Sequence, residues 1–249
     1  MCSRRYPDLI PASRFTRGTA LVVAPHPDDE VAICGGMLLH HVDAGNSVEV
    51  VFLTDGAMGS WKSGHDAEYI SLREKEARAA CKFQGISDPR FLGFPDGEIQ
   101  PEGELVDTLR GLIEDVDPYV IYCASFFEIH ADHHNAARAL LNALNGAKKD
   151  PLLLFGEVGA PVWANILVDI STVMERKVSA LKYYESQLSA NDYVPPLRGL
   201  NQYRTVNIDM NNIAFVEAYL LGRSQDLNGM VALADSMALI AQAAADRTA

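Results

Sequence analysis

Short apolar runs alternate with amphipathic segments along the first two thirds of the chain. Apolar runs rich in β-branched residues are typical of strands buried on both faces of a parallel sheet. Such strands are expected at residues 19–24, 47–54, 119–123 and 152–155, with a shorter one near 90–92. Apolar residues spaced three and four apart predict helices between them, at residues 31–44, 67–84, 102–117 and 132–145.

Strands that alternate with helices at this spacing predict an α/β fold. We expect a single-domain, Rossmann-like architecture: a doubly wound, mostly parallel sheet with helices on both faces. The domain should comprise an N-terminal arm at residues 1–17, a doubly wound core at 18–170, and C-terminal helices and a strand at 171–249 that complete it.

The pattern is less regular beyond residue 160. It predicts strands at 165–170 and 204–208, a helix from residue 172, a loop at 189–203 and two C-terminal helices. The length of 249 residues suffices for one sizeable core but is short for two independent ones.

Composition narrows the function classes. A formal net charge of −12 argues against nucleic-acid binding, which normally needs clustered Lys and Arg. No run of eighteen apolar residues is present, so we expect no membrane insertion. The four cysteines have no CxxC spacing, which favours a reducing cytoplasm. The expected partner is a small molecule, and a homo-oligomer is compatible with the sequence.

The segment His26-Pro27-Asp28-Asp29-Glu30 directly follows the first predicted strand. In a doubly wound sheet this places it at the carboxyl edge, where ligands bind. Consecutive carboxylates repel one another unless a cation or hydrogen-bond donors compensate. An acidic helix N-terminus, stabilised by the helix dipole, is the alternative explanation for this segment.

A second cluster, His130-Ala131-Asp132-His133-His134, follows another predicted strand, so both clusters can face one crevice. Four of the seven histidines lie in these two clusters. Two histidines with one carboxylate leave a coordination position open, as in catalytic zinc sites. We therefore predict that His26, Asp29 and His133 bind a metal. Zn²⁺ is expected, although iron(II) or another divalent transition metal suits the same ligands.

The remaining polar residues of the clusters fit roles in hydrolysis. Asp28 is the candidate general base, because it lies beside the ligands and could take a proton from water on the metal. His130, with Asp132 to orient its ring, could stabilise an oxyanion as an imidazolium and protonate the departing amine. His134 is expected to point away from the site.

The two clusters and their order resemble the PIG-L/LmbE-like superfamily of zinc-dependent N-acetylglucosaminyl deacetylases. The resemblance rests on ALVVAPHPDDE and HADHHNAAR, and is supported by LREKE, FLGFPDG and YESQ between and after them. It implies the same metal ligands, the same base, and His130 with Asp132 assisting the tetrahedral intermediate. It further implies that Arg73 and Asp96 approach the sugar. A surface ion pair of Arg73 with Glu76, and a turn role for Asp96, are the alternatives.

The sequence thus predicts a metal-dependent hydrolase that removes an acetyl or acyl group from the amine of an N-acetylglucosamine-type conjugate. Family members differ in substrate, residues 125–128 are more apolar than expected beside a sugar pocket, and residues 191–249 match no family motif, so another amide is an open alternative. Ala131 stands where the family commonly has Pro, but this departure removes no ligand. A two-histidine, one-carboxylate iron(II) oxygenase and a non-catalytic sugar- or nucleotide-binding module are further alternatives. The binding module is disfavoured because no GxGxxG follows the first strand.

Overall fold

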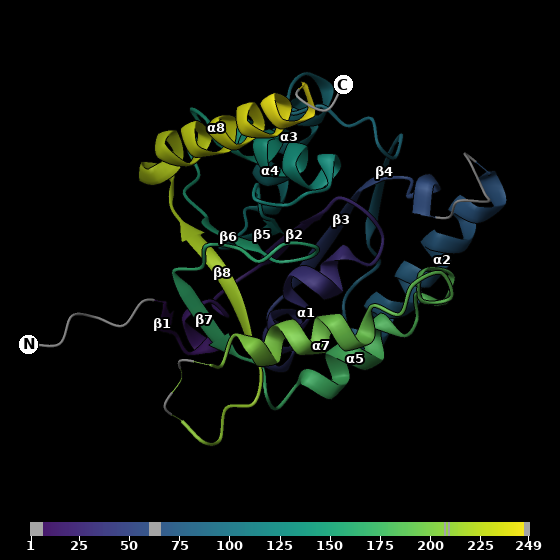
Figure 1. Ribbon diagram of the computed structural model, residues 1–249, viewed down its shortest axis with the longest axis vertical. Coiled ribbons are helices and arrows are strands. Elements are labelled where there is room, and N and C mark those ends of the chain that lie inside the picture. Colours follow the sequence, from purple (N-terminus) through teal and green to yellow (C-terminus); the bar gives the residue numbers. More distant parts are fainter. Residues whose placement is uncertain (1–6, 60–65, 207, 209, 247–249) are drawn as a thin grey trace, which may run out of the picture.

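The fold is a three-layer α/β structure built on one eight-stranded sheet, as seen in a computed structural model that describes residues 7–59, 66–206, 208 and 210–246 (Figure 1). The strand order is β1-β7-β8-β6-β5-β2-β3-β4. The strands are β1 (Asp8–Leu9), β2 (Ala20–Ala24), β3 (Val48–Thr54), β4 (Arg90–Phe94), β5 (Val120–Ala124), β6 (Leu152–Gly156), β7 (Ile166–Asp169) and β8 (Val216–Gly222).

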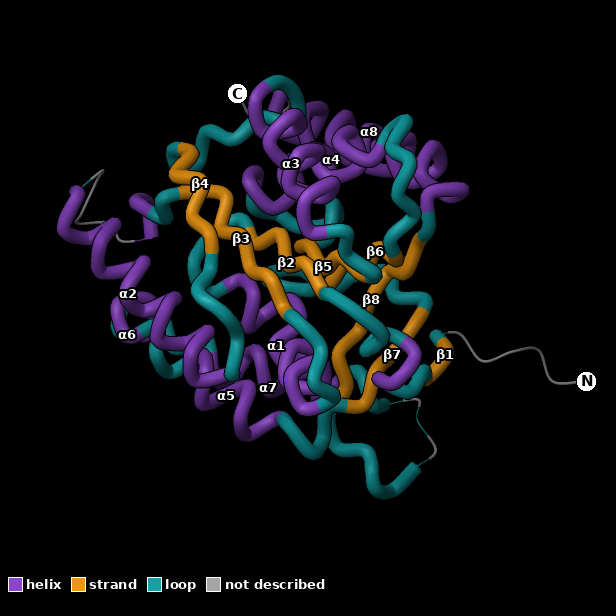
Figure 2. The backbone as a smooth tube through the Cα atoms, turned by 180° about the vertical axis from the view of Figure 1, so that it is seen from behind, coloured by secondary structure: helices purple, strands orange, loops and turns teal. Residues whose placement is uncertain are grey.

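Helices cover both faces of this sheet, as expected for the predicted architecture (Figure 2). The α-helices are α1 (Asp29–Asp43), α2 (Ala67–Gln84), α3 (Glu104–Val116), α4 (Ala131–Leu144), α5 (Met174–Leu181), α6 (Glu185–Leu188), α7 (Val194–Tyr203) and α8 (Leu227–Asp246). Short 3₁₀ turns lie at Ala12–Arg14, Ala57–Gly59 and Ser224–Asp226. Among the described residues, no helix has the length and apolar character to cross a membrane.

A hydrophobic core lies on each face of the sheet. Each central strand contributes side chains to both cores, because successive side chains point to opposite faces. Val22 of β2 packs in the cluster that includes residues of α1, α2 and α5. The neighbouring Val23 packs with residues of α3, α4 and α8. Both side chains are fully buried, which explains why the sequence of β2 is apolar throughout.

The sheet has a switch point between β2 and β5. From β2 the chain adds β3 and then β4 on one side, and it returns to add β5 on the other side of β2. Both β2–β3 and β2–β5 pairs are parallel. A doubly wound sheet binds its ligands at the carboxyl ends of the strands that flank such a point.

The C-terminal third corrects three of the sequence predictions. Residues 194–203 form α7 where a loop was expected; prolines 195 and 196 are tolerated there because they lie in its first turn. The strand expected at 204–208 is wrong: residues 204–206 follow α7 as a turn, and the strand is β8. The two helices expected at the C-terminus are also wrong, because β8 stands in place of the first and the described residues beyond it form one α-helix, α8. β8 pairs antiparallel with both β6 and β7, so its backbone is satisfied on both sides. Residue 207 lies outside the described residues.

Part of the predicted N-terminal arm belongs to the fold. β1 pairs with β7 in parallel, and the side chain of Phe15 is buried in the core. Residues 1–6 lie outside the described residues.

Helix α1 is broken at Cys34, whose φ of −151° and ψ of 19° are not helical. The break leaves the N–H groups of Gly36 and Met37 free, and both donate to the carboxylate of Glu217 at 2.7 and 3.0 Å. On the other side of the break, Lys177 Nζ donates to the carbonyl oxygen of Ala32 and to Glu217 Oε1, at 3.2 and 2.7 Å. A fully buried ion pair thus satisfies both broken ends of the helix.

Candidate metal centre and catalytic residues

The first cluster forms the turn between β2 and α1, at the switch point. Asp28 is the residue before α1, and its φ of 119° lies in the region that favours glycine. This backbone conformation places Asp28 and Asp29 in different surroundings. Asp29 is buried, and one of its carboxylate oxygens accepts a hydrogen bond from the backbone N–H of His26 at 2.9 Å.

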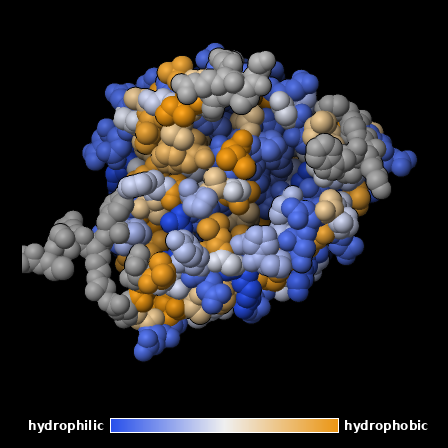
Figure 3. Space-filling view, in the orientation of Figure 1, coloured by the Kyte–Doolittle hydropathy of each residue, from blue (hydrophilic) through white to orange (hydrophobic). Residues whose placement is uncertain are grey.

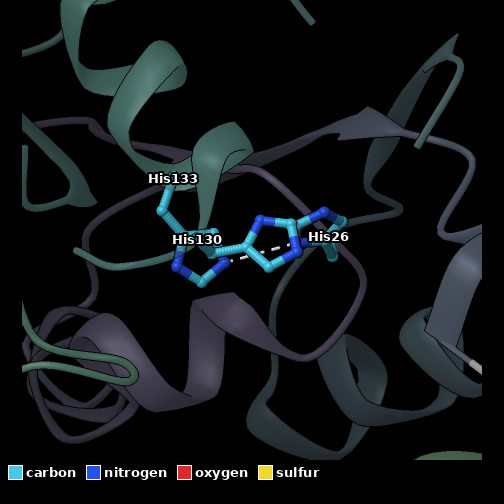
Figure 4. Close-up of side chains that lie close together, drawn as sticks. All are labelled: His26, His130 and His133. Atoms are coloured by element: carbon cyan, nitrogen blue, oxygen red, sulfur yellow. Dashed lines mark hydrogen bonds between the residues drawn. The ribbon is translucent and has the colours of Figure 1, made fainter. Parts of the chain in front are cut away.

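Three ligand-type atoms meet in front of this turn. Asp29 Oδ2 lies 3.1 Å from His26 Nδ1 and 3.1 Å from His133 Nε2, and the two nitrogens are 3.3 Å apart. Figure 4 shows how His133, at the start of α4, reaches His26 in the loop after β2. Tetrahedral zinc, with bonds of about 2.0–2.1 Å, separates its ligand atoms by roughly 3.3 Å. The spacing therefore fits a single metal ion on the three predicted residues.

The other ring nitrogen of His26 faces two carboxylates. Nε2 lies 3.1 Å from Asp96 Oδ1 and 3.1 Å from Asp132 Oδ2. These carboxylates also accept backbone N–H groups, from Met58 to Asp96 and from Gly97 to Asp132. His26, Asp96 and Asp132 have the spacing of a second ligand set. Metal-binding histidines usually donate their other N–H to a carboxylate, so these two residues fit better as acceptors that orient His26.

The structure thus gives Asp132 a different partner from the one predicted. Its carboxylate contacts His26, whereas the ring of His130 receives only the backbone N–H of Asp132, at 3.2 Å to Nδ1. His130 is the N-cap residue of α4, and a capping side chain accepts from the first turn. Asp132 is buried inside that turn, which is why its side chain points to the neighbouring loop.

Asp28 stands beside the three ligand-type residues and contacts Arg73. Arg73 Nη2 lies 3.3 Å from Asp28 Oδ2, and the guanidinium also donates to the carbonyl oxygens of Pro27 and Gly56. Arg73 is buried, so the alternative of a surface ion pair with Glu76 is wrong. Burial raises the pKa of Asp28 to about 7, although the charge of Arg73 opposes the rise.

His130 is exposed and lies across the site from Asp28's turn. Its ring centre is 4.8 Å from that of His26 and 4.9 Å from that of His133 (Figure 4). Partial burial, together with His26 and His133, lowers the pKa of His130 below its usual value and so favours the neutral ring. Because Nδ1 accepts a backbone hydrogen bond, the proton of the neutral ring lies on Nε2. His134 points away, as predicted, and contacts the carbonyl oxygen of Phe126.

The weaker sequence motifs come together behind the site. Glu76 accepts the backbone N–H and the hydroxyl of Ser186, at 2.8 and 2.6 Å. Gln187 donates to the hydroxyl of Tyr69 at 2.6 Å. The Arg-x-x-Glu helix and the Ser-Gln motif are therefore one structural unit: Glu76 holds the later motif while Arg73 faces the site.

Glu128 is a buried residue near the site that the sequence analysis did not single out. Its Oε2 lies 3.6 Å from His133 Nδ1. The only signal in the sequence was its position two residues before His130, in an otherwise apolar stretch.

Similarity to known proteins agrees with this geometry. The family model described as GlcNAc-PI de-N-acetylase (PIG-L) matches residues 21–144, the segment that contains both histidine clusters. A probable N-acetyl-α-D-glucosaminyl L-malate deacetylase 2 from Bacillus cereus is 31% identical over 189 residues, which cover 68% of this chain and 84% of the relative. The chain belongs to the PIG-L family.

Other PIG-L relatives show the range of the family. N,N′-diacetylchitobiose deacetylase from Pyrococcus horikoshii has the same fold, with a TM-score of 0.73 and 22% identity over 84% of this chain and 85% of that one. A 4-oxalmesaconate hydratase from Pseudomonas putida is 26% identical over 225 residues, 80% of this chain and 87% of the relative. Relatives of this PIG-L protein therefore carry names of more than one reaction.

Proposed function

We propose that this protein is a metal-dependent hydrolase that removes the acetyl group from the amine of an N-acetylglucosamine-type conjugate. The observation that carries the proposal is the meeting of His26, Asp29 and His133 at 3.1–3.3 Å, with a fourth polar residue, Asp28, beside them and not among them. A hydrolase needs both parts, a metal site with an open position and a separate base.

His26, Asp29 and His133 would hold the metal, for which we propose zinc. Two imidazoles with one carboxylate suit zinc, and the carboxylates facing His26 Nε2 support a proton there and a free lone pair on Nδ1. When bound, such a metal polarises a carbonyl and makes water nucleophilic near neutral pH.

Asp28 would accept the proton that the attacking water loses. Its raised pKa suits this task, because a base that titrates near the working pH can take up a proton and release it again. Arg73 would hold the carboxylate in place through its contact at 3.3 Å. The lowered pKa of His130 favours its neutral ring, and Asp28, once it has taken up the proton of water, can return it to the departing amine.

His130 would stabilise the developing oxyanion as a neutral donor. Its Nε2 carries the proton and its exposed ring is accessible to a substrate. The predicted imidazolium is disfavoured by the lowered pKa. A well-placed donor at this position is worth roughly 10²–10³ in rate in other acyl-transfer enzymes.

The proposed substrate class rests on the relatives of this protein and not on the geometry of the site. The relatives named above include two deacetylases of N-acetylglucosamine compounds, and Asp96 lies at the site where the family resemblance implies contact with the sugar. We propose a small amino-sugar conjugate as substrate. The buried, unpaired cysteines Cys34, Cys81 and Cys123 support a reducing compartment such as the cytoplasm.

The test is release of primary amine from a panel of N-acetylglucosamine conjugates by protein loaded with Zn²⁺ and by chelator-treated protein. We expect release that depends on the metal. Asp28→Asn should retain the metal and lose at least about 10²-fold in kcat, because the base is removed while the ligands stay. His133→Ala is the matched control and should lose both metal and activity.

Each experimental outcome tests a different part of the proposal. Firm metal binding without amine release would contradict the deacetylase, and hydration of 4-oxalmesaconate would then point to the reaction named for the Pseudomonas relative. Full activity of Asp28→Asn would show that another residue is the base.

A further inference from the structure

Glu128 is a buried carboxylate between two parts of the molecule. It follows β5, at the same sheet edge as the histidine clusters, and its side chain has no exposed surface. Both oxygens accept hydrogen bonds from three successive backbone N–H groups of the loop after β6. Val158 donates at 2.7 Å, Gly159 at 2.9 Å and Ala160 at 3.1–3.2 Å.

The same carboxylate faces His133. Its Oε2 is 3.6 Å from Nδ1, and Nδ1 is buried without a hydrogen-bond partner in the described part of the chain. Since Nε2 points to Asp29 and His26, a ligand role for Nε2 requires the proton to be on Nδ1. That N–H would point toward the negative charge of Glu128.

The geometry points to Glu128 as a positioning residue for His133, which ties the ligand to the loop after β6. This inference rests on the proposed metal site. A shortening of about half an ångström would bring Glu128 and His133 to hydrogen-bond distance. The backbone N–H groups fix the carboxylate, so the shift must come largely from the ring of His133.

His26 and His133 each have a carboxylate near the ring nitrogen that is not a proposed ligand atom, but different parts of the chain hold these carboxylates. His26 Nε2 has two carboxylates at 3.1 Å, one from the loop after β4 and one from the first turn of α4. His133 Nδ1 has one carboxylate, and that carboxylate is held by a loop about thirty residues further along the chain. Metal affinity and the order of this loop should therefore be linked through Glu128.

A second buried carboxylate provides a matched control. Glu157 begins the same loop, accepts the backbone N–H of Val162 at 2.8 Å and pairs with Arg204. Among the contacts of the described residues, it has none with a proposed ligand. Glu157→Gln should weaken the loop without changing the surroundings of His133.

The experiment measures Zn²⁺ affinity of the full-length protein by competition with a chromophoric chelator, and hydrogen exchange of the peptide that contains residues 157–164. We expect Glu128→Ala to lower the affinity about 10–100-fold, as loss of such partners does elsewhere, and to speed exchange in the loop. Glu128→Gln, which keeps an acceptor for the loop N–H groups, should fold and show a smaller loss. Glu157→Gln should speed exchange and leave the affinity unchanged.

Equal Zn²⁺ affinity of the wild-type protein, Glu128→Gln and Glu128→Ala would overturn the inference, and so would an equal loss in Glu157→Gln. Failure of the wild-type protein itself to bind Zn²⁺ would refute the proposed metal site instead, so the two failures are distinguishable.

Discussion

The two parts of the chain, residues 20–156 and residues 157–246, contribute differently to the site. The first part supplies every proposed ligand and catalytic residue, from the loops and first helical turns that follow the neighbouring parallel strands β2 and β5. The second part supplies none of them. It supplies supports instead: Lys177 and Glu217 at the break in α1, Ser186 on Glu76, and the loop that holds Glu128.

This difference shows that the site's geometry depends on residues that the chemistry never uses. Asp29 lies in the first turn of α1, only five residues before the break at Cys34. The second part of the chain fixes both sides of that break. Substitutions in the second part should therefore change stability and metal affinity more than they change the rate of the reaction itself.

The largest loss of stability should come from Lys177→Met, which leaves the carboxylate of Glu217 buried without its ion-pair partner. Breaking a buried pair on one side costs about 3–5 kcal/mol, because the remaining buried charge has lost its counter-charge. Urea unfolding of the metal-free protein measures this loss. The exposed Lys182 is the control, and Lys182→Met should change the free energy of unfolding by less than about 0.5 kcal/mol. A loss below about 1 kcal/mol for Lys177→Met would refute the supporting role.

The stability of the protein should depend on pH through His41, which lies in the first part of the chain. His41 is buried in α1, where its Nε2 contacts the hydroxyl of Tyr122 at 3.0 Å. Burial lowers the pKa of His41 to about 4, below its usual 6.5. Between these values the unfolded chain binds a proton that the folded protein does not, so stability should fall as the pH drops from 6.5 to 4, by at most about 1.4 kcal/mol per pH unit.

His41→Gln removes this titration and keeps a polar group near Tyr122. Acid unfolding followed by circular dichroism should then begin at a lower pH than in the wild-type protein. Identical acid-unfolding curves would show that His41 does not contribute to the pH dependence.

The smallest effect should come from the ion pair that joins the two parts at the surface. Arg138 on α4 and Asp235 on α8 are 2.7 Å apart, but the side chain of Asp235 is 48% exposed. Asp235→Ala should therefore cost no more than about 1 kcal/mol, and less at high salt. Thermal unfolding at two salt concentrations measures this. A larger loss that does not depend on salt would indicate that Asp235 contributes more to stability than an exposed ion pair does.

Apolar side chains gather at the upper left of Figure 3, in the region of α8. Leu239 and Ile240 are exposed, while Met230 and Ala234 pack against the core of the first part. Burial of these small and flexible side chains attaches the helix more than the ion pair does.

The first part was predictable because its local signals and its tertiary structure agree. Helix α2 ends where Gly85 adopts a positive φ, and the strands are apolar because both faces are buried. β8 was missed because Glu217, a charged residue near its start, interrupts the apolar run; that charge is buried and paired with Lys177. The sequence pattern alone does not reveal a pairing partner forty residues away.

The site shows the same limit. His26, Asp29 and His133 meet as predicted, since sequence spacing and strand order place both clusters at one edge. The partner of Asp132 was not predictable, because its side-chain direction depends on where the loop containing Gly97 lies. Glu128 was missed for a related reason: its partners are backbone N–H groups, which have no signature in the sequence.

Asp28 has a φ of 119°, a backbone conformation that costs a residue with a Cβ roughly 1–3 kcal/mol. Glycine would adopt it without that cost. The fold is therefore less stable at the position that carries the proposed base than it would be with glycine there. Selection of variants for heat resistance alone would favour replacement of Asp28, and the assay that guides such engineering has to include turnover.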